Sequence, residues 1–194
     1  MIEREIKIMV SDYELFQFAK KFDALAISKK ILQINYYFDT QDFLLASQGS
    51  TLRIRQKENQ LVLQYKYEKQ NNGAENTSKE FEKEIRSFSS HITSAALPND
   101  IIGASAIITY DYIGTLITER TNYLYNDVEV SLDKNHYLGK SDCEIELEFQ
   151  EYEQVKSVLG LFFVEDIEFS TTGKYSRFVK ELQKISCAGA NNGC

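Results

Sequence analysis

Charged and apolar side chains alternate in several segments of this chain, and each segment carries mostly one sign of charge. Residues 51–57 and 61–66 carry mainly Arg and Lys, whereas residues 2–7, 80–84 and 142–148 carry mainly Glu. Successive side chains of a β-strand point to opposite faces, so each segment predicts a strand with one charged face and one apolar face. The chain must therefore fold into a sheet that keeps these two faces apart.

Two architectures separate the faces in this way. One is a sheet with its apolar face on a core and its charged face in water. The other is a closed barrel whose charged faces point into a central tunnel and whose apolar outside is covered by helices. Segregation of charge by strand favours the barrel, because a solvated face more often mixes both signs within one strand. The tunnel would then have a basic wall facing an acidic wall.

The remaining segments supply strands and covering helices for such a barrel. Ser11 and Glu14 have the spacing of a capping box, and apolar residues at helical spacing follow them. We expect helices near residues 12–24, 88–105 (broken at Pro98), 151–162 and 172–185. We expect strands at residues 2–10, 31–40, 50–58, 61–69, 79–87, 107–119, 120–126, 127–134 and 142–149. Residues 41–49 are predicted as a connection, and the polar, glycine-bearing residues 70–78 as a loop.

Length and composition indicate one globular domain. The chain has 194 residues, enough for a substantial core, and we expect a domain over residues 1–186 with a flexible tail at 187–194. The net charge of −7 argues against nucleic acid or an anionic membrane as a partner. No apolar run approaches the roughly 20 residues of a membrane helix, and the N-terminus is charged within its first five residues, so we expect neither a membrane helix nor a signal peptide.

The cysteines and histidines offer no recognisable site. Cys143, Cys187 and Cys194 match no zinc spacing, and we interpret them as reduced thiols of a cytoplasmic protein. His91 and His136 are the only histidines, and both are predicted to be surface residues outside the strands. The chemistry must therefore come from the charged strand faces.

Opposed basic and acidic walls predict a particular kind of ligand. Arginine binds phosphate oxygens bidentately, and lysine acts on them as a point charge. Clustered glutamates suit a hard divalent cation such as Mg²⁺ or Mn²⁺. Both walls together fit a metal-bound polyphosphate, because phosphoryl transfer needs positioning and charge neutralisation more than covalent groups.

Short motifs along the chain resemble the CYTH superfamily, also called triphosphate tunnel metalloenzymes. Glu3-x-Glu5-x-Lys7 looks like the ExExK signature of its first strand, and Leu52-Arg53-Ile54-Arg55 matches its LRIR-like strand. Other similar segments are Tyr36-Tyr37-Phe38-Asp39-Thr40, Leu63-Gln64-Tyr65-Lys66, the acidic strand with Glu80, Glu82 and Glu84, Arg120, Leu132-Asp133, Leu138-Gly139, Glu144-Ile145-Glu146, and Lys174 with Arg177. The resemblance covers about residues 2–178.

This resemblance implies a fold and a set of roles. The fold would be α+β, mainly β, with an eight-stranded antiparallel β-barrel that has a charged interior and is covered by helices. Mg²⁺ or Mn²⁺ would be held by Glu3, Glu5 and Glu146, supported by Glu144, Glu82 or Glu84. Phosphates would be bound by Lys7, Arg53, Arg55, Lys66, Arg120, Lys174 and Arg177. Glu5, Lys7 and Glu144 would act in catalysis, and Tyr36 and Tyr37 would be packing and substrate-edge residues.

Three functions fit these residues. The first is metal-dependent hydrolysis of inorganic triphosphate or of a nucleoside or thiamine triphosphate. The second is cyclisation of ATP, as in the class IV adenylate cyclases of this superfamily, although no adenine-specific motif occurs. The third is non-catalytic binding of polyphosphate or nucleotide, which the departure from the family motif at Gln64 favours slightly. The expected partner is a triphosphate-containing small molecule, and whether the chain forms a homodimer stays open.

Overall fold

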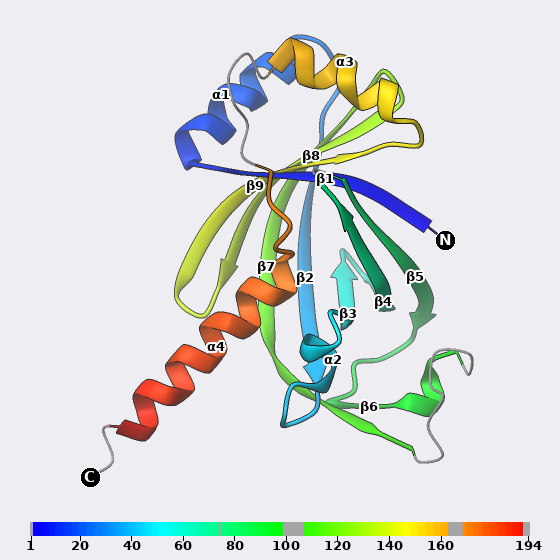
Figure 1. The fold of residues 1–194 in the computed structure, drawn as a ribbon, viewed down its shortest axis with the longest axis vertical. Helices are drawn as coiled ribbons and strands as arrows, with labels where there is room; N and C mark the ends of the chain where they lie inside the picture. Colours follow the sequence, from blue (N-terminus) through cyan, green and yellow to red (C-terminus); the bar gives the residue numbers. More distant parts are fainter. Residues whose placement is uncertain (1, 74, 99–106, 163–168, 192–194) are drawn as a thin grey trace.

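A closed barrel of eight antiparallel strands forms the centre of the molecule (Figure 1). The computed structural model describes residues 2–73, 75–98, 107–162 and 169–191. The barrel strands are β1 (Ile2–Val10), β2 (Lys29–Asp39), β3 (Thr51–Lys57), β4 (Gln60–Asn72), β5 (Glu75–Ile85), β7 (Thr109–Tyr125), β8 (Val128–Tyr137) and β9 (Lys140–Glu148). Their order is β2-β3-β4-β5-β1-β9-β8-β7, and pairing of β2 with β7 closes the ring. The predicted barrel is confirmed.

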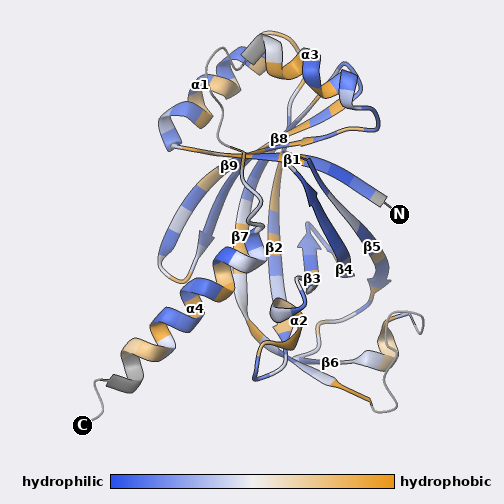
Figure 2. Ribbon diagram, viewed as in Figure 1, coloured by the Kyte–Doolittle hydropathy of each residue, from blue (hydrophilic) through white to orange (hydrophobic). Residues whose placement is uncertain are grey.

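Helices cover the apolar outside of the barrel and one of its ends. They are α1 (Asp12–Asp23), α2 (Leu44–Ser47), α3 (Tyr152–Phe162) and α4 (Lys174–Asn191). In Figure 1, α1 and α3 lie together over β1, β8 and β9, whereas α4 extends away from the barrel to the C-terminus. Figure 2 shows apolar residues alternating with polar ones along the strands, as the sequence predicts.

The main core lies between the barrel and the α1–α3 layer. Ile6, Ile145 and Leu147 point outward from β1 and β9 and pack with Phe22 of α1 and Val155 of α3. All five side chains are fully buried. Burial of these apolar side chains fixes which face of each strand points out, so the intervening charged residues must point into the barrel.

The capping box at the start of α1 is confirmed. The Ser11 hydroxyl accepts a hydrogen bond from the Glu14 backbone N–H at 3.2 Å, and the Glu14 carboxylate accepts one from the Ser11 backbone N–H at 2.7 Å. The helix ends at Asp23, close to the predicted end. The capping box therefore fixes where the chain leaves β1 and begins to cover the barrel.

The two strands predicted at residues 107–119 and 120–126 are one strand of 17 residues, β7. The adjacent charges Glu119 and Arg120 do not mark a turn, because they point to opposite faces. Glu119 contacts His136 outside the barrel at 2.9 Å, and Arg120 binds Asp133 inside it. His136 lies on β8, which runs to Tyr137, and His91 is the first residue of strand β6 (His91–Thr93), so the prediction that both histidines lie outside strands is wrong.

The predicted loop at residues 70–78 belongs mostly to β4 and β5. Gln70 pairs with Thr77 and Asn71 pairs with Asn76, and Gly73 occupies the turn with a φ of +67°. Polar residues can form this ladder because its side chains face either solvent or the polar inside of the barrel. They therefore need no apolar neighbours.

The predicted helices at residues 88–105 are not observed in the described part of that segment. It contains strand β6 (His91–Thr93), which pairs with β7, and a short 3₁₀-helix (Ser94–Ala96). Ile92 and Leu97 pack in a second core cluster with Tyr110 on the outside of the barrel. Residues 99–106 lie outside the described residues. Pairing with the free end of β7 therefore outweighs the weak helical pattern.

Helix α4 is longer than predicted, and α2 was not predicted. Residues 187–191 of the expected tail are helical, and residues 192–194 lie outside the described part. Asp39 anchors both helices: its carboxylate accepts hydrogen bonds from the Leu45 and Ala46 N–H groups, at 2.8 and 3.0 Å, and from the Tyr175 hydroxyl at 2.5 Å. Asp39 is the last residue of β2 and holds both helices at the end of that strand.

Among the described helices, none has both the length and the apolar character needed to cross a membrane. Cys143 is buried and Cys187 is exposed, and both are free thiols.

Candidate functional site

The inside of the barrel forms a cavity of about 520 Å³. Strands β3 and β9 stand four places apart in the ring of eight (β3-β4-β5-β1-β9), so they face each other across it. The basic lining residues on β3 and β4 are Arg53, Arg55, Lys57, Lys66 and Lys69. The acidic lining residues are Glu3, Glu5, Glu80, Glu82, Glu129, Glu146 and Glu148. The start of α4 borders the cavity with Lys174 and Tyr175.

Three carboxylates on neighbouring strands form a site that could hold a metal ion. Glu5 on β1 lies directly opposite Glu148 on β9, and carboxylate oxygens of Glu3, Glu5 and Glu148 all lie within 4.8 Å of one another. Burial and the nearby charges of Glu3 and Glu146 raise the pKa of Glu148 to about 8. Such crowding fits a divalent cation with oxygen ligands, because the cation would offset the repulsion.

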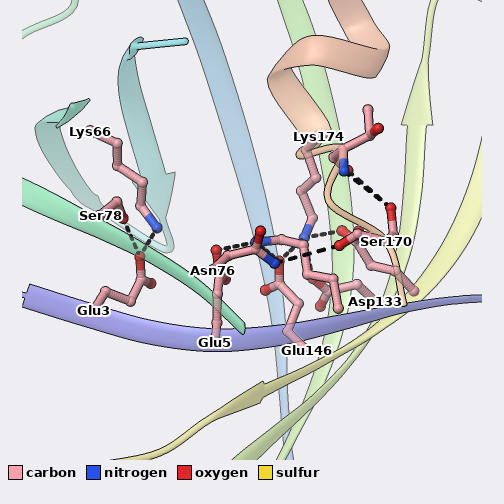
Figure 3. Close-up of polar contacts among 12 residues, drawn as sticks. Glu3, Glu5, Lys66, Asn76, Ser78, Asp133, Glu146, Ser170 and Lys174 are labelled. Atoms are coloured by element: carbon pink, nitrogen blue, oxygen red, sulfur yellow. Dashed lines mark hydrogen bonds and ion pairs between the residues drawn. The ribbon is translucent and has the colours of Figure 1, made fainter. Parts of the chain in front are cut away.

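An unpaired acceptor lies beside this group. Asn76 is the cross-strand neighbour of Glu5, and its side-chain oxygen is buried without a hydrogen-bond partner in the described structure. Figure 3 shows Asn76 next to Glu5 and Glu146. Its oxygen adds a further acceptor to a set of groups that suits a cation.

Lys66 connects the basic wall to the acidic wall. Its ammonium group forms an ion pair with Glu3, which also accepts a hydrogen bond from the Ser78 hydroxyl at 3.3 Å (Figure 3). Burial alone would raise the pKa of Glu3, but the charge of Lys66 outweighs it and lowers that pKa to about 2. Lys66, assigned to phosphate by resemblance, therefore neutralises a candidate metal ligand in this structure.

A second group of carboxylates, Asp133, Glu144 and Glu146, encloses the ammonium group of Lys174. The Lys174 nitrogen lies 2.8 Å from both Asp133 and Glu146, and Arg120 also binds both of these residues. Burial raises the pKa of Glu146, but Lys174 and Arg120 outweigh it, so that pKa falls well below its usual value. The protein's own cations thus balance this second group.

Arg55 on the basic wall interacts electrostatically with Glu80 but has a neutral hydrogen-bond partner. The Arg55 guanidinium donates to the Asn35 side-chain oxygen at 3.0 Å and forms no ion pair with any described residue. Burial, together with the charges of Arg53 and Arg120, lowers the pKa of Arg55 to about 9. Burial and Arg55 likewise lower the pKa of Lys57. An anion placed between these groups would relieve their mutual repulsion.

Lys69 enters the cavity because of an irregularity in β4. The register of β4 shifts between Tyr67 and Gln70, and Glu68 has a φ of +50°. Lys69 therefore lines the cavity, and its ammonium group donates to the Thr51 hydroxyl at 2.9 Å. Burial and the charges of Lys66 and Lys7 lower the pKa of Lys69 to about 8. Strict alternation from Lys66 would have pointed Lys69 outward.

Gln64, where the chain departs from the family motif, bridges the two kinds of wall. Its side-chain oxygen accepts from the Arg53 guanidinium at 2.7 Å, and its side-chain nitrogen donates to Glu82. Arg53 also lies 3.8 Å from Glu80. Gln64 thus holds Arg53 in place inside the cavity.

The structure brings most of the predicted site residues together. Lys7 lies on the acidic wall, in ion pairs with Glu5 and, at 3.7 Å, with Glu146. Burial lowers its pKa, but Glu5 and Glu146 outweigh this effect and raise it. The cavity lining includes these three residues together with Glu3, Glu82, Arg53, Arg55, Lys66, Arg120 and Lys174.

Three predicted site residues lie outside the lining. Glu84 is exposed near the end of β5. Glu144 is fully buried behind Lys174, and Arg177 binds both Glu144, at 3.0 Å, and Asp142, at 2.8 Å. Arg177 and Glu144 therefore attach α4 to β9.

Six charged residues at the site have no role in the sequence predictions: Lys57, Lys69, Glu80, Glu129, Asp133 and Glu148. Lys57 and Glu148 continue the alternation of β3 and β9, so the strand pattern could have identified them. Asp133 lies on the inner face of β8, and the sequence predictions include it only within the Leu132-Asp133 motif. Lys69 had no sequence signal, because the shift in β4 reverses the direction of its side chain.

A closed antiparallel barrel with opposed acidic and basic inner walls defines a charged β-tunnel. Residues 1–178 match the model of the CYTH domain, so the chain belongs to the CYTH family. It is 30% identical to the Bacillus subtilis protein YjbK, a candidate triphosphatase, over 191 residues, which cover 94% of this chain and 97% of YjbK.

Solved structures share the fold. HpAC1 from Hippeastrum, a candidate adenylyl cyclase described as revealing a dominant triphosphatase activity, has a TM-score of 0.73. It is 24% identical, and the match covers 92% of this chain and 95% of HpAC1. A candidate adenylate cyclase from Bacillus halodurans has a TM-score of 0.65 at 29% identity, over 90% of this chain and 95% of that protein.

Proposed function

We propose that this protein is a divalent-metal-dependent triphosphatase. The observation that carries the proposal is that one cavity holds both a crowded carboxylate group, Glu3, Glu5 and Glu148, and a buried cation, Arg55, that forms no ion pair among the described residues. A metal-bound triphosphate has the complementary charges for both walls. The name of YjbK, a candidate triphosphatase similar over nearly its whole length, supports the same activity.

The β3–β4 wall would bind the phosphate chain. Arg53 and Arg55 offer planar guanidinium groups, and Lys66 would exchange Glu3 for a phosphate oxygen. Lys57 and Lys69 extend the same basic surface on either side. Arg120 and Lys174 would add positive charge from the opposite side of the cavity while both stay paired with Asp133.

The β1–β9 wall would hold Mg²⁺ or Mn²⁺ through Glu3, Glu5 and Glu148, next to Glu146. When bound, such an ion supplies charge neutralisation and Lewis acidity. Lys7 would orient Glu5, and the Glu5 carboxylate would accept a hydrogen bond from the attacking water. Glu144 is buried behind Lys174 and forms an ion pair with its ammonium group. This contact supports a positioning role for Glu144, because the Lys174 ammonium group borders the cavity.

A substrate panel tests the proposal. Tripolyphosphate, ATP and thiamine triphosphate are each incubated with the protein in Mg²⁺, in Mn²⁺ and in excess chelator, and phosphate release is measured. We expect release from at least one triphosphate that requires added metal. Failure of every substrate with both metals would contradict the proposal.

Cyclisation of ATP is the second candidate, because the 29% identical Bacillus halodurans protein is a candidate adenylate cyclase. The same walls could bind the polyphosphate of ATP, with the ribose hydroxyl attacking in place of water. Chromatography of the ATP products separates the two reactions. ADP and phosphate indicate hydrolysis to a diphosphate, whereas cyclic AMP and pyrophosphate indicate cyclisation.

A further inference from the structure

The hydroxyl of Tyr37 is buried in the cavity wall without a hydrogen bond. Tyr37 on β2 is 0% exposed and lines the cavity, and its hydroxyl has no partner among the described residues. Other tyrosine hydroxyls at the edges of the core are bonded: those of Tyr123, Tyr137 and Tyr175 donate to Asp23, Asp142 and Asp39 at 2.9, 2.8 and 2.5 Å. An unsatisfied buried hydroxyl is costly, so the Tyr37 group needs an explanation.

Packing prevents the Tyr37 ring from turning its hydroxyl toward solvent. The ring centroid lies 4.9 Å from that of Tyr175 and 5.2 Å from that of Phe178, both on α4. On β7 the cross-strand neighbour of Tyr37 is Gly114, whose α-carbon lies against the Phe178 ring. A partner for the hydroxyl must therefore come to it from the cavity.

The polar surroundings of Tyr37 offer donors. Arg53 is its cross-strand neighbour on β3, and Tyr37 is one of the groups whose electrostatic interaction affects the pKa of Arg55. A guanidinium group donates hydrogen bonds and accepts none. The hydroxyl can donate its own hydrogen only to an acceptor that enters between these groups, and the two guanidinium groups favour an anionic acceptor.

We propose that Tyr37 is a substrate-contacting residue whose hydroxyl donates a hydrogen bond to a phosphate oxygen held by Arg53 and Arg55. This inference rests on the proposed function, because it deepens the description of the same site. Since the ring packs against α4, the contact also joins the phosphate to the helix that carries Lys174.

Tyr37→Phe tests the proposal, because it removes the hydroxyl and keeps the ring that packs on α4. Binding of inorganic tripolyphosphate in excess chelator is measured by calorimetry, and stability by urea unfolding. We expect about tenfold weaker binding, as for one hydrogen bond to a charged group. We also expect the urea midpoint to stay the same or rise, because the variant has no unsatisfied buried hydroxyl.

Tyr123→Phe is the matched control. It removes a bonded tyrosine hydroxyl outside the cavity, so it should lower the urea midpoint and leave tripolyphosphate binding unchanged. Unchanged binding by a folded Tyr37→Phe variant, while the parent protein binds, would overturn this inference alone. A lower midpoint for Tyr37→Phe with unchanged binding would overturn it too, since the hydroxyl would then be structural. Absence of binding by the parent protein would contradict the proposed function and this inference with it.

Discussion

Two arginines of the cavity differ in how their charge is balanced, and this difference separates stability from binding. Arg120 is 8% exposed and binds Asp133 through two hydrogen bonds, at 2.7 and 2.6 Å, and also Glu146. Arg55 donates a hydrogen bond to a neutral group, the Asn35 side-chain oxygen, and forms no ion pair within the described part of the chain. Breaking a buried ion pair leaves an uncompensated charge, whereas removing an unpaired buried charge relieves repulsion.

Arg120→Gln should therefore lower the free energy of unfolding by about 3–5 kcal/mol, because Asp133 and Glu146 lose one of the two cationic partners that they share and keep Lys174. Arg55→Gln should leave the free energy of unfolding unchanged or slightly higher, while it weakens tripolyphosphate binding at least tenfold. Urea unfolding and calorimetry measure the two effects. Equal destabilisation by both substitutions would refute the assignment of Arg55 as an unpaired anion-binding group.

The pKa of Lys69, about 8, predicts how binding depends on pH. Below pH 8 the lysine is charged and can attract a phosphate, whereas above pH 8 the ligand-free protein loses this charge. Binding of tripolyphosphate would raise the pKa of Lys69 again, so binding above pH 8 must take up a proton, and affinity falls as pH rises.

Lys69→Gln and Lys69→Arg isolate this effect from the titration of tripolyphosphate itself. The affinity ratio of parent to Lys69→Gln should be largest near pH 7 and approach one near pH 10. Lys69→Arg should keep the affinity of the parent at pH 7 and exceed it at pH 9, because arginine stays charged. A parent-to-Gln ratio that does not change with pH would show that Lys69 does not titrate as predicted.

At the scale of the elements, the first turns of α4 pack their apolar face against the barrel strands β2 and β7. Tyr175, Phe178 and Val179 pack against Tyr37 and Leu116 of β2 and β7. The register of β2 against β7 shifts between Tyr37 and Phe38, next to this contact. Lys174 and Arg177 then reach the carboxylates of β8 and β9 from the same helix.

Gly114→Ala should disturb this packing. Gly114 has a φ of +147°, and an added Cβ would lie 2.6 Å from the Phe178 ring. We expect the free energy of unfolding to fall by about 1–3 kcal/mol, from strain and displacement of the ring. Gly160→Ala in α3 is the control, because its Cβ would meet no atom within 4 Å, and a helical alanine should stabilise by up to about 1 kcal/mol. Circular dichroism during urea unfolding measures both, and equal stability of the two variants would contradict this account of the α4 contact.

At the scale of the whole molecule, alternation predicted the barrel and most of the cavity lining. A side chain such as Arg53 or Glu146 lies between outward apolar neighbours, so its direction follows from the strand period. Lys69 could not be placed, because a shift in register reverses that period. Glu144 and Arg177 could not be assigned, because their pairing depends on where α4 docks, which is a tertiary contact.

In the proposed function the two walls of one cavity have separate partners, the acidic wall a metal ion and the basic wall a phosphate chain. Paired calorimetric titrations with Mn²⁺ and with tripolyphosphate in excess chelator test this claim on Glu5→Gln and Arg55→Gln. Glu5→Gln should weaken Mn²⁺ binding at least tenfold and leave tripolyphosphate binding equal or tighter, because one negative charge leaves the cavity and Lys7 loses a partner. Arg55→Gln should weaken tripolyphosphate binding and leave Mn²⁺ binding equal or tighter. Parallel loss of both ligands in both folded variants, or loss of neither, would contradict the account.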